Sequence, residues 1–390
     1  MNQNTKNFID RHVHDDIYTL ALKAQSYHDV DITLAIRQIE GKQKTERKVP
    51  VFYRCTELLF PPKLSLEQSS SEVTSRYKST LCSGNKLVDL TGGFGIDCFF
   101  MSEKFKNIVY IEKEKELCKL AKHNFKVLGR DCIEVVNETA ERFLETDFDA
   151  DWIFIDPARR KSDGTKAVLL SDCEPNIALL QKKLLIKAEN VLIKLSPMFD
   201  LVQLQRELHS IKTIHIVAIE NECKEILVVL KRNYNENIKI KAIHFLKNKN
   251  PEWLEFDNEN EKALNIDCTK DVEKYLYEPN CAILKSGAFK TISHKYNLHK
   301  LHTNSHLYTS EKLLPEFQGR IFEVKNVIDY KKSNLKKMDI PKANLTTRNF
   351  PLTVAELRKK LNINEGGDDY IFATTLSNNN LVLINCKKLK

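Results

Sequence analysis

The alternation of apolar and polar segments between residues 86 and 195 predicts short strands separated by helices. Short continuous apolar runs rich in Val and Ile are typical of strands that are buried on both faces. We predict strands over 86–90, 107–112, 133–136, 152–156 and 191–195, and helices over 96–105, 114–128, 139–145 and 175–189. This order is typical of an open parallel sheet covered by helices on both faces.

The alternation ends in a different pattern after residue 195. Residues 213–219 and 225–230 are two apolar runs rich in β-branched residues, and five mostly polar residues separate them. Two such runs predict an antiparallel hairpin. A nicotinamide-binding domain would continue the strand–helix alternation, so the hairpin disfavours a dehydrogenase. We therefore predict an α/β fold with a doubly wound, mostly parallel, seven-stranded sheet.

The segments that flank this domain have weaker patterns. Residues 8–60 have apolar positions at helix-like intervals, so we expect a helical region over 1–64, with Gly41 as a helix C-cap followed by a basic loop. The α/β domain is expected over 65–235. After it the pattern predicts small α+β modules over 236–330 and 331–390, the last with a helix at 354–361 and strands at 370–375 and 381–386.

Composition places limits on the class of protein. The chain has 390 residues, ten cysteines without a Cys-x-x-Cys pair, and a net charge of +8. Scattered cysteines beside apolar runs favour free thiols in a reducing compartment, and with no apolar signal region or membrane-length run we expect a cytoplasmic protein. The charge favours an anionic partner, although solubility alone equally explains it.

The first predicted strand runs into a glycine-rich turn and then a helix. Glycines lack the Cβ atoms that would keep a nucleoside-bearing ligand away from the backbone, and the following helix directs its N–H groups into the same crevice. The alternative is a plain tight turn. The candidate ligand-binding residues of this segment are Asp89, Thr91, Gly92, Gly93 and Gly95.

Three later strands also end in polar residues. Glu112 ends the second strand, where a carboxylate can accept hydrogen bonds from both hydroxyls of a ribose. Residues 137–139 follow the third strand and would meet an adenine amino group; they are Asn137, Glu138 and Thr139. Asp156 and Pro157 end the fourth strand. Because the carboxyl ends of parallel strands share one edge of a sheet, these residues are expected to form one site.

These four elements, in this order, resemble the class I S-adenosylmethionine-dependent methyltransferases over residues 65–235. The resemblance implies that the loop from Asp89 to Gly95 wraps the methionine part of S-adenosyl-L-methionine and that Glu112 binds its ribose. It also implies that the methyl acceptor faces the catalytic motif, which contains Asp156, Pro157 and Arg159. The hairpin corresponds to the antiparallel last strand of that fold.

Further motifs narrow the resemblance to one bacterial methyltransferase family. Residues 155–160, 194–200, 221–225 and 342–351 are similar to the family that carries a ferredoxin-like module and a C-terminal THUMP-like domain. The resemblance implies a ferredoxin-like module within 236–330, a THUMP-like domain within 331–390, and structured RNA (tRNA or rRNA) as the substrate. It implies neither a membrane nor a metal partner.

The acceptor motif departs from the pattern of enzymes that methylate amino groups of nucleic acids. Those enzymes carry an aromatic residue that stacks on the flipped base, whereas this chain has Ala158 and Arg159. Arg159 or Arg160 would stack through its guanidinium plane, hold a phosphate, or lie on the surface in an ion pair. Three alternatives therefore remain: a protein acceptor, a small-molecule acceptor, or a cofactor-binding scaffold without catalysis.

Two other clusters have conventional interpretations. His294, His299, His302 and His306 lie close in sequence without acidic or Cys neighbours, so packing or surface positions are favoured over a metal site. The basic run 331–337 is either a solvated charge run or a contact with RNA. The oligomeric state is not determined by the sequence.

Overall fold

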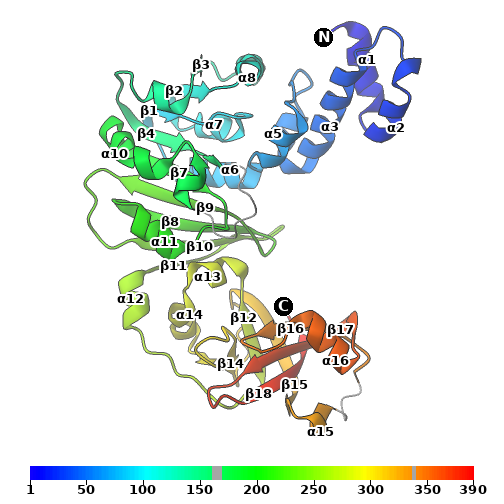
Figure 1. The fold of residues 1–390 in the computed structure, drawn as a ribbon, viewed down its shortest axis with the longest axis vertical. Helices are drawn as coiled ribbons and strands as arrows, with labels where there is room; N and C mark the ends of the chain where they lie inside the picture. Colours follow the sequence, from blue (N-terminus) through cyan, green and yellow to red (C-terminus); the bar gives the residue numbers. More distant parts are fainter. Residues whose placement is uncertain (160–168, 336–339) are drawn as a thin grey trace. The chain divides into compact units, whose positions relative to one another are not determined.

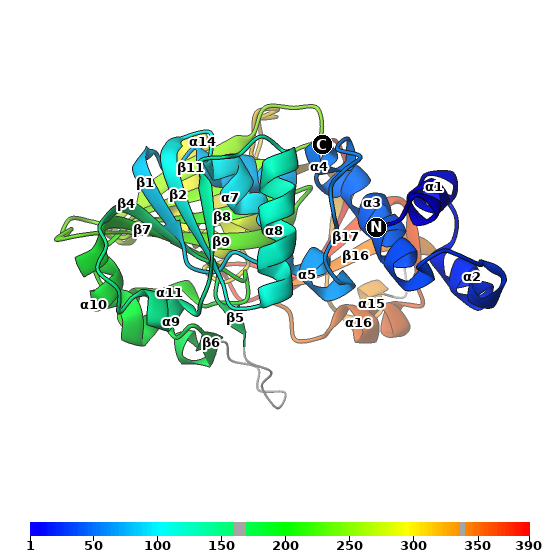
Figure 2. The same ribbon diagram turned by 90° about the horizontal axis from the view of Figure 1, so that it is seen from above.

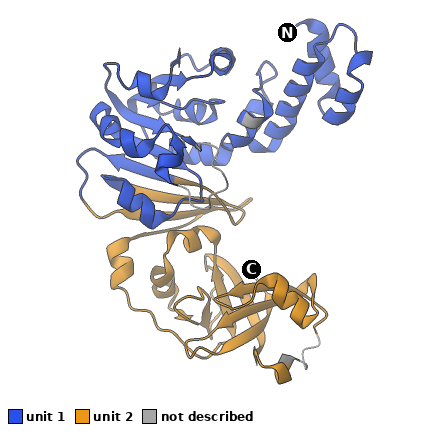
Figure 3. Ribbon diagram, viewed as in Figure 1, with its two compact units in different colours: residues 1–212, 227–235 blue, residues 213–226, 236–390 orange. Residues whose placement is uncertain are grey.

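The computed structural model describes residues 1–159, 169–335 and 340–390 (Figure 1). These residues divide into two compact units, and Figure 3 colours them separately. Unit 1 contains residues 1–212 and 227–235, and unit 2 contains residues 213–226 and 236–390. The domain boundaries expected from the sequence stay predictions.

The N-terminal region is helical, as the apolar spacing predicts. Its first three α-helices pack around a small core of Phe8, Ile9, Leu20, Ala35 and Ile39. The helices are α1 (Gln3–His12), α2 (Ile17–Leu22), the 3-10 turn η1 (Ala24–Ser26), α3 (Ile32–Lys48), α4 (Pro50–Tyr53), α5 (Lys63–Gln68) and α6 (Glu72–Ser79).

The predicted C-cap at Gly41 is wrong, because α3 continues through this residue to Lys48. A Cβ atom at Gly41 would lie 2.2 Å from the ring of Phe60, so the glycine serves close packing. The basic residues 42–48, expected in a loop, form the second half of the helix.

The large sheet has nine strands in the order β11-β10-β8-β9-β7-β4-β1-β2-β3. Its first five strands in chain order lie next to one another, and all neighbours among them pair in parallel. Their bounds are β1 (Gly84–Asp89), β2 (Phe105–Glu112), β3 (Ile133–Asn137), β4 (Ala150–Ile155) and β7 (Ala188–Leu195). The strand order reverses at β1, which lies between β2 and β4.

Helices cover this sheet on both faces. Figure 2 shows α8 on one side of the strands and α10 and α11 on the other. The helices are α7 (Ile96–Met101), α8 (Lys115–Val127), α9 (Ala140–Phe143), α10 (Ile177–Lys187) and α11 (Leu201–Glu207). The remaining short elements are β5 (Ala158–Arg159), η2 (Leu170–Asp172) and β6 (Cys173–Glu174), and β5 pairs with β6 in a separate small sheet.

The predicted hairpin is present, and its strands are longer than expected. β8 (Ile211–Ile219) and β9 (Glu222–Lys231) leave a turn of two residues, Glu220 and Asn221, with φ angles of 49° and 62°. Positive φ at both central residues is typical of the type I′ turn, whose twist matches that of the strands.

The predicted doubly wound α/β class is confirmed, with two strands beyond the seven expected. β10 (Lys239–Phe245) pairs parallel to β8, and β11 (Glu252–Asp257) pairs antiparallel to β10. Residues 239–257 therefore extend the large sheet, although the sequence analysis placed them in the module that follows.

The rest of unit 2 forms a second sheet of seven strands, in the order β13-β14-β12-β15-β18-β17-β16. Neighbouring strands of this sheet pair antiparallel except β16 with β17, which pair in parallel. The elements are α12 (Asn258–Ala263), β12 (Tyr275–Pro279), α13 (Cys281–Ser286), α14 (Phe289–Tyr296), β13 (His299–Lys300), β14 (Tyr308–Ser310), β15 (Gly319–Asp329), α15 (Lys332–Leu335), β16 (Lys342–Arg348), α16 (Val354–Leu361), β17 (Asn364–Thr375) and β18 (Leu381–Lys388).

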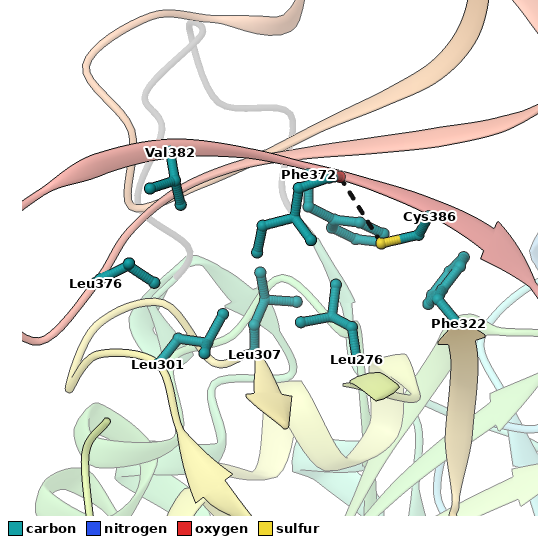
Figure 4. Close-up of a cluster of buried hydrophobic side chains, with 9 residues drawn as sticks. Leu276, Leu301, Leu307, Phe322, Phe372, Leu376, Val382 and Cys386 are labelled. Carbon is teal, nitrogen blue, oxygen red and sulfur yellow. Dashed lines mark hydrogen bonds between the residues drawn. The ribbon is translucent and has the colours of Figure 1, made fainter. Parts of the chain in front are cut away.

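One apolar core joins the two halves of this sheet. Figure 4 shows Leu276, Leu301 and Leu307 packed against Phe322, Phe372 and other residues of β15, β17 and β18. A second cluster places α16 against β16, β17 and β18 through residues such as Leu357 and Leu383. Across the part of the chain that is described, no helix has the length and apolar character needed to span a membrane.

Candidate active site

The candidate site lies at the carboxyl ends of β1, β2 and β4, where the strand order reverses. Open α/β sheets bind ligands in the crevice outside such strand ends. The glycine-rich loop leaves β1 after Asp89 and enters α7 at Gly95. Gly93 and Gly95 have φ angles of +60° and +81°, in the left-handed region that glycine adopts without strain.

Gly92 and Gly93 serve different purposes. A Cβ atom on Gly92 would lie 2.1 Å from the ring of Tyr110, which is fully buried and donates a hydrogen bond to the Gly93 carbonyl at 2.6 Å. A Cβ atom on Gly93 meets only the Thr91 carbonyl, at 3.9 Å. The loop is therefore packed against β2 through Gly92 and leaves open space above Gly93.

We expect Gly92→Ala to lower the free energy of unfolding by about 1–3 kcal/mol, the range for overpacked cores. Gly93→Ala meets no steric obstacle and carries only the roughly 1–2 kcal/mol cost of a left-handed alanine. Urea unfolding of both variants tests the packing. In calorimetric titration with S-adenosyl-L-methionine, Gly93→Ala should lose affinity because its methyl group occupies the open space. Unchanged affinity in Gly93→Ala would contradict the predicted cofactor position.

Glu112 ties the loop after β1 to the loop after β2. Its carboxylate accepts hydrogen bonds from the backbone N–H groups of Gly93 and Glu114, both at 2.8 Å. The residue is 9% exposed. This arrangement fixes the carboxylate at the end of β2, next to the open space above Gly93.

The last residue of β3 and the two residues after it organise the neighbouring turns. Asn137 donates its side-chain amide to the carbonyls of Glu112 and Lys113, each at 2.9 Å. Glu138 accepts a hydrogen bond from the N–H of Thr139, and Thr139 caps α9 by accepting one from Arg142. All three lie at the same sheet edge as Glu112, and their contact with an adenine stays a prediction.

Asp89 and Thr91 join β1 to the end of β4. Asp89 is 1% exposed and accepts a hydrogen bond from the Thr91 N–H at 3.0 Å. Burial, together with the charges of Asp97, Asp156 and Glu112, raises the pKa of Asp89 well above its usual value, which outweighs the hydrogen bond from Thr91. The Thr91 hydroxyl accepts a hydrogen bond from the N–H of Asp156 at 2.6 Å.

Asp156 is paired with a lysine that the sequence analysis did not single out as a site residue. The Lys194 ammonium, on β7, donates to one carboxylate oxygen of Asp156. The side chains of Lys194 and Asp156 are 12% and 33% exposed. Pro157 follows Asp156, and Arg159 then pairs through its backbone with Cys173 in the β5–β6 ladder. Arg160 lies outside the described residues.

A buried ionic network beside the loop is the largest feature that sequence reasoning missed. Asp97, in the first turn of α7, contacts the ammonium of fully buried Lys78 at 3.2 Å. It also accepts hydrogen bonds from the hydroxyls of Ser70 and Ser75, at 2.7 and 2.5 Å. Burial raises the pKa of Asp97, but Lys78, Lys194 and the two serines outweigh burial, so its pKa is lowered overall.

Lys48 adds a third cation to this region. Burial and the charge of Lys194 lower its pKa to about 8, and its ammonium donates to the carbonyls of Leu66 and Glu67. The only sequence signal for this network was the serine-rich segment before β1. Ser71 caps α6, and the adjacent Ser70 donates a hydrogen bond to Asp97.

The histidines of unit 2 make ordinary contacts. His299 hydrogen bonds to Glu273, and His306 stacks on Phe289 with ring centroids 3.6 Å apart. Among the described residues, no group of three or more His, Cys, Asp or Glu side chains is arranged to hold a metal ion. The basic run is described only as far as residue 335, where its first part forms α15.

The sheet order and the residues at the strand ends define the fold as that of a class I methyltransferase. The crystal structure of a putative methyltransferase from Porphyromonas gingivalis W83 is similar over 99% of this chain and 98% of that chain, with 34% sequence identity and a TM-score of 0.87. Residues 275–317 match a family model described as a ferredoxin-like domain, and residues 319–388 match one described as THUMP domain-like. The chain therefore belongs to the methyltransferase family that carries a ferredoxin-like domain and a C-terminal THUMP-like domain.

Other solved structures are similar to part of the chain. A conserved hypothetical protein from Streptococcus pyogenes is 17% identical, covers 40% of this chain and 91% of its own, and has a TM-score of 0.30. An rRNA methylase from Streptococcus thermophilus is 14% identical, covers 41% of this chain and 94% of its own, and has a TM-score of 0.31. No curated protein sequence matches the chain at a significant level.

Proposed function

We propose that the protein uses S-adenosyl-L-methionine to methylate a base of structured RNA, either tRNA or rRNA, in the cytoplasm. The observation that carries this proposal is the convergence of the glycine-rich loop, Glu112 and Asp156 at the point where the strand order reverses. The THUMP domain-like match over residues 319–388 and the net charge of +8 support RNA as the substrate. The ten free thiols favour a reducing compartment.

The residues present fit the proposed cofactor. The open space above Gly93 allows a ligand to approach the backbone closely. The fixed carboxylate of Glu112 retains acceptor capacity for ribose hydroxyls, because each carboxylate oxygen has two lone pairs and uses one of them for a backbone N–H. Asn137, Glu138 and Thr139 would adjoin the adenine. When bound, the cofactor supplies a methyl group already activated by its sulfonium.

The protein's contribution to the reaction would be positioning. Asp156 is held from two directions, by Thr91 at its backbone and by Lys194 at one carboxylate oxygen. The second oxygen would accept a hydrogen bond from an acceptor amine and direct its lone pair toward the methyl group. No strong base is required, because the amine proton becomes acidic once the nitrogen is methylated.

The direct test is transfer of tritium from labelled S-adenosyl-L-methionine to total RNA from a strain lacking the gene. RNase-sensitive label retained on filters would support an RNA methyltransferase and allow the nucleotide to be mapped. Label that survives RNase would point to a protein acceptor. Cofactor binding seen by calorimetry, without methyl transfer to any RNA, would instead favour a small-molecule acceptor or a non-catalytic scaffold. In a scaffold, Arg159 in place of the aromatic residue would mark an acceptor site that has lost its activity.

Glu112→Gln is expected to weaken cofactor binding about 10- to 100-fold. An amide keeps one oxygen, so either Gly93 or Glu114 would lose its acceptor and face an N–H₂ group, at a cost of about 1–3 kcal/mol. Isothermal titration calorimetry with S-adenosylhomocysteine measures the loss. Glu114→Gln, which keeps the backbone N–H that Glu112 binds, is the matched control. Equal affinities in the two variants would rule out a ribose-binding role for Glu112.

A further inference from the structure

A pocket in unit 2 is lined by none of the residues of the strand ends described above. β11 is the edge strand of the large sheet (Figure 1). Beside it, α14 and the segment before β15 enclose an open cavity of about 620 Å³. This volume lies in the range of small-ligand sites. Its wall includes Glu252, Trp253, Thr291, Lys295, Glu316 and Gln318.

Trp253 is the unusual residue of this wall. Its side chain is 62% exposed, although tryptophan is a large, mostly apolar residue that is normally well covered. Its backbone is fixed from two sides. Residue 253 pairs with Ile243 on β10, and its carbonyl accepts a hydrogen bond at 2.8 Å from the buried side chain of Gln318. Trp253 therefore lines the cavity from a rigid edge strand.

The charges of the wall are not equivalent. Glu252 contacts Lys390 at 3.2 Å and His244 at 3.3 Å, and Glu255 contacts Lys241 at 2.7 Å. Burial raises the pKa of Glu252, but the hydrogen bond from His244 and the charge of Lys390 lower it overall, so this carboxylate is ionised and paired. Glu316, by contrast, is exposed, and none of the described side chains binds its carboxylate.

We propose that this cavity binds a nucleobase bearing an exocyclic amino group, within a single-stranded segment of RNA. The indole of Trp253 stacks on the base, since every base has a π-face and aromatic stacking is the common way of holding unpaired bases. The Glu316 carboxylate accepts the hydrogen bond of the amino group, the contact by which carboxylates recognise cytosine. This inference rests on the proposed RNA substrate, and it adds a second place on the protein that would contact this RNA.

Tryptophan fluorescence reports on this pocket directly. The chain has two tryptophans, so Trp152→Phe leaves Trp253 as the single fluorophore. Short oligocytidine should quench its emission in a saturable way, and oligouridine, which has no exocyclic amine, should bind at least about fivefold more weakly. In Glu316→Gln the ratio of the affinity for oligocytidine to the affinity for oligouridine should fall. Absence of quenching by oligocytidine, or equal binding of both oligonucleotides before and after Glu316→Gln, overturns the proposal.

A second measurement does not depend on the fluorescence variant. The anisotropy of labelled oligocytidine should show roughly 5- to 100-fold weaker binding by Trp253→Ala than by the wild type, the range expected for loss of one stacked base. Trp253→Phe keeps an aromatic ring and should lose less. Equal affinities for all three proteins overturn the proposal.

The outcomes separate the two proposals. Oligocytidine binding that depends on Trp253, in a protein that transfers no methyl group to RNA, would leave the pocket standing and remove the proposed activity. If the protein methylates RNA but its RNA binding does not depend on Trp253 or Glu316, the proposed activity would stand and the proposed pocket would fall.

Discussion

Replacement of Asp97 by alanine is expected to lower the free energy of unfolding by about 3–5 kcal/mol, the usual cost of leaving a buried charge without its partner. Lys78 is fully buried, and its ammonium lies 3.2 Å from the Asp97 carboxylate. Ser70 and Ser75 would also lose their acceptor. Urea unfolding followed by circular dichroism measures the difference.

A double variant provides the control for this expectation. In Lys78→Met with Asp97→Asn the buried charges are both absent, while the amide oxygen still accepts from one serine and the amide N–H₂ group donates to the hydroxyl of the other. Replacing a complete buried ion pair is often close to neutral, so the double variant should recover at least half of the stability lost in Asp97→Ala. A double variant as unstable as the single one would show that packing, rather than charge, controls this region.

The same network predicts a pH dependence. The pKa of Asp97 is lowered in the folded protein, so its contribution to stability is complete above its unfolded pKa of about 3.9 and is lost as the pH falls through the folded pKa. Below about pH 4 the wild type should therefore lose stability more steeply than Asp97→Asn. Asp89, whose pKa is raised, acts in the opposite direction but is common to both proteins. Parallel curves would contradict the role of Asp97.

Asp156→Ala is expected to reduce the rate of methyl transfer by roughly 100- to 1000-fold, the scale on which positioned acid–base and hydrogen-bonding groups act. The physical reason is loss of the oxygen that would align the acceptor. Cofactor affinity should change little, because the contacts from Asp156 to the cofactor loop run through its backbone N–H to Thr91, and alanine keeps that group. Single-turnover transfer of labelled methyl groups to RNA gives the rate.

Lys194→Met separates the proposed action of the Asp156 carboxylate on the acceptor from its ion pair with Lys194. If Asp156 acts on the acceptor, this variant should retain more activity than Asp156→Ala, because the carboxylate remains. Asp156→Asn should lie between them. An Asp156→Ala protein that methylates at the normal rate would eliminate the residue from the catalytic motif.

The local sequence was sufficient for the catalytic fold. Continuous Val- and Ile-rich runs identified β1, β2, β3, β4 and β7 to within a few residues, because strands buried on both faces leave a clear apolar pattern. Glycines at a strand end, followed by a carboxylate after the next strand, located the loop that we propose binds the cofactor. The contact between Glu112 and Gly93, nineteen residues apart, follows directly from that order.

Contacts between residues far apart in the chain could not be predicted from local sequence patterns. Lys78 resembles any lysine of an amphipathic helix, and only the fold shows that it lies buried against Asp97. The Asp156–Lys194 pair requires β4 and β7 to be neighbours with matched ends. Gly41 was misinterpreted for the same reason, since the packing of Phe60 against a helix leaves no local signal. β10 and β11 joined the large sheet through partners that no periodicity specifies.

The position of β18 bears on how this protein is synthesised. This strand is the last of the seven-stranded sheet in chain order, yet it pairs between β15 and β17. It also supplies Val382 and Ile384 to the apolar core that joins the two halves of that sheet. Until residues 381–388 leave the ribosome, β15 and β17 both expose an unpaired edge and half of an apolar core, which are the features that make nascent chains aggregate. The two family-model segments should therefore fold as one late cooperative event, and we expect chaperone dependence during translation to concentrate in this half of the chain.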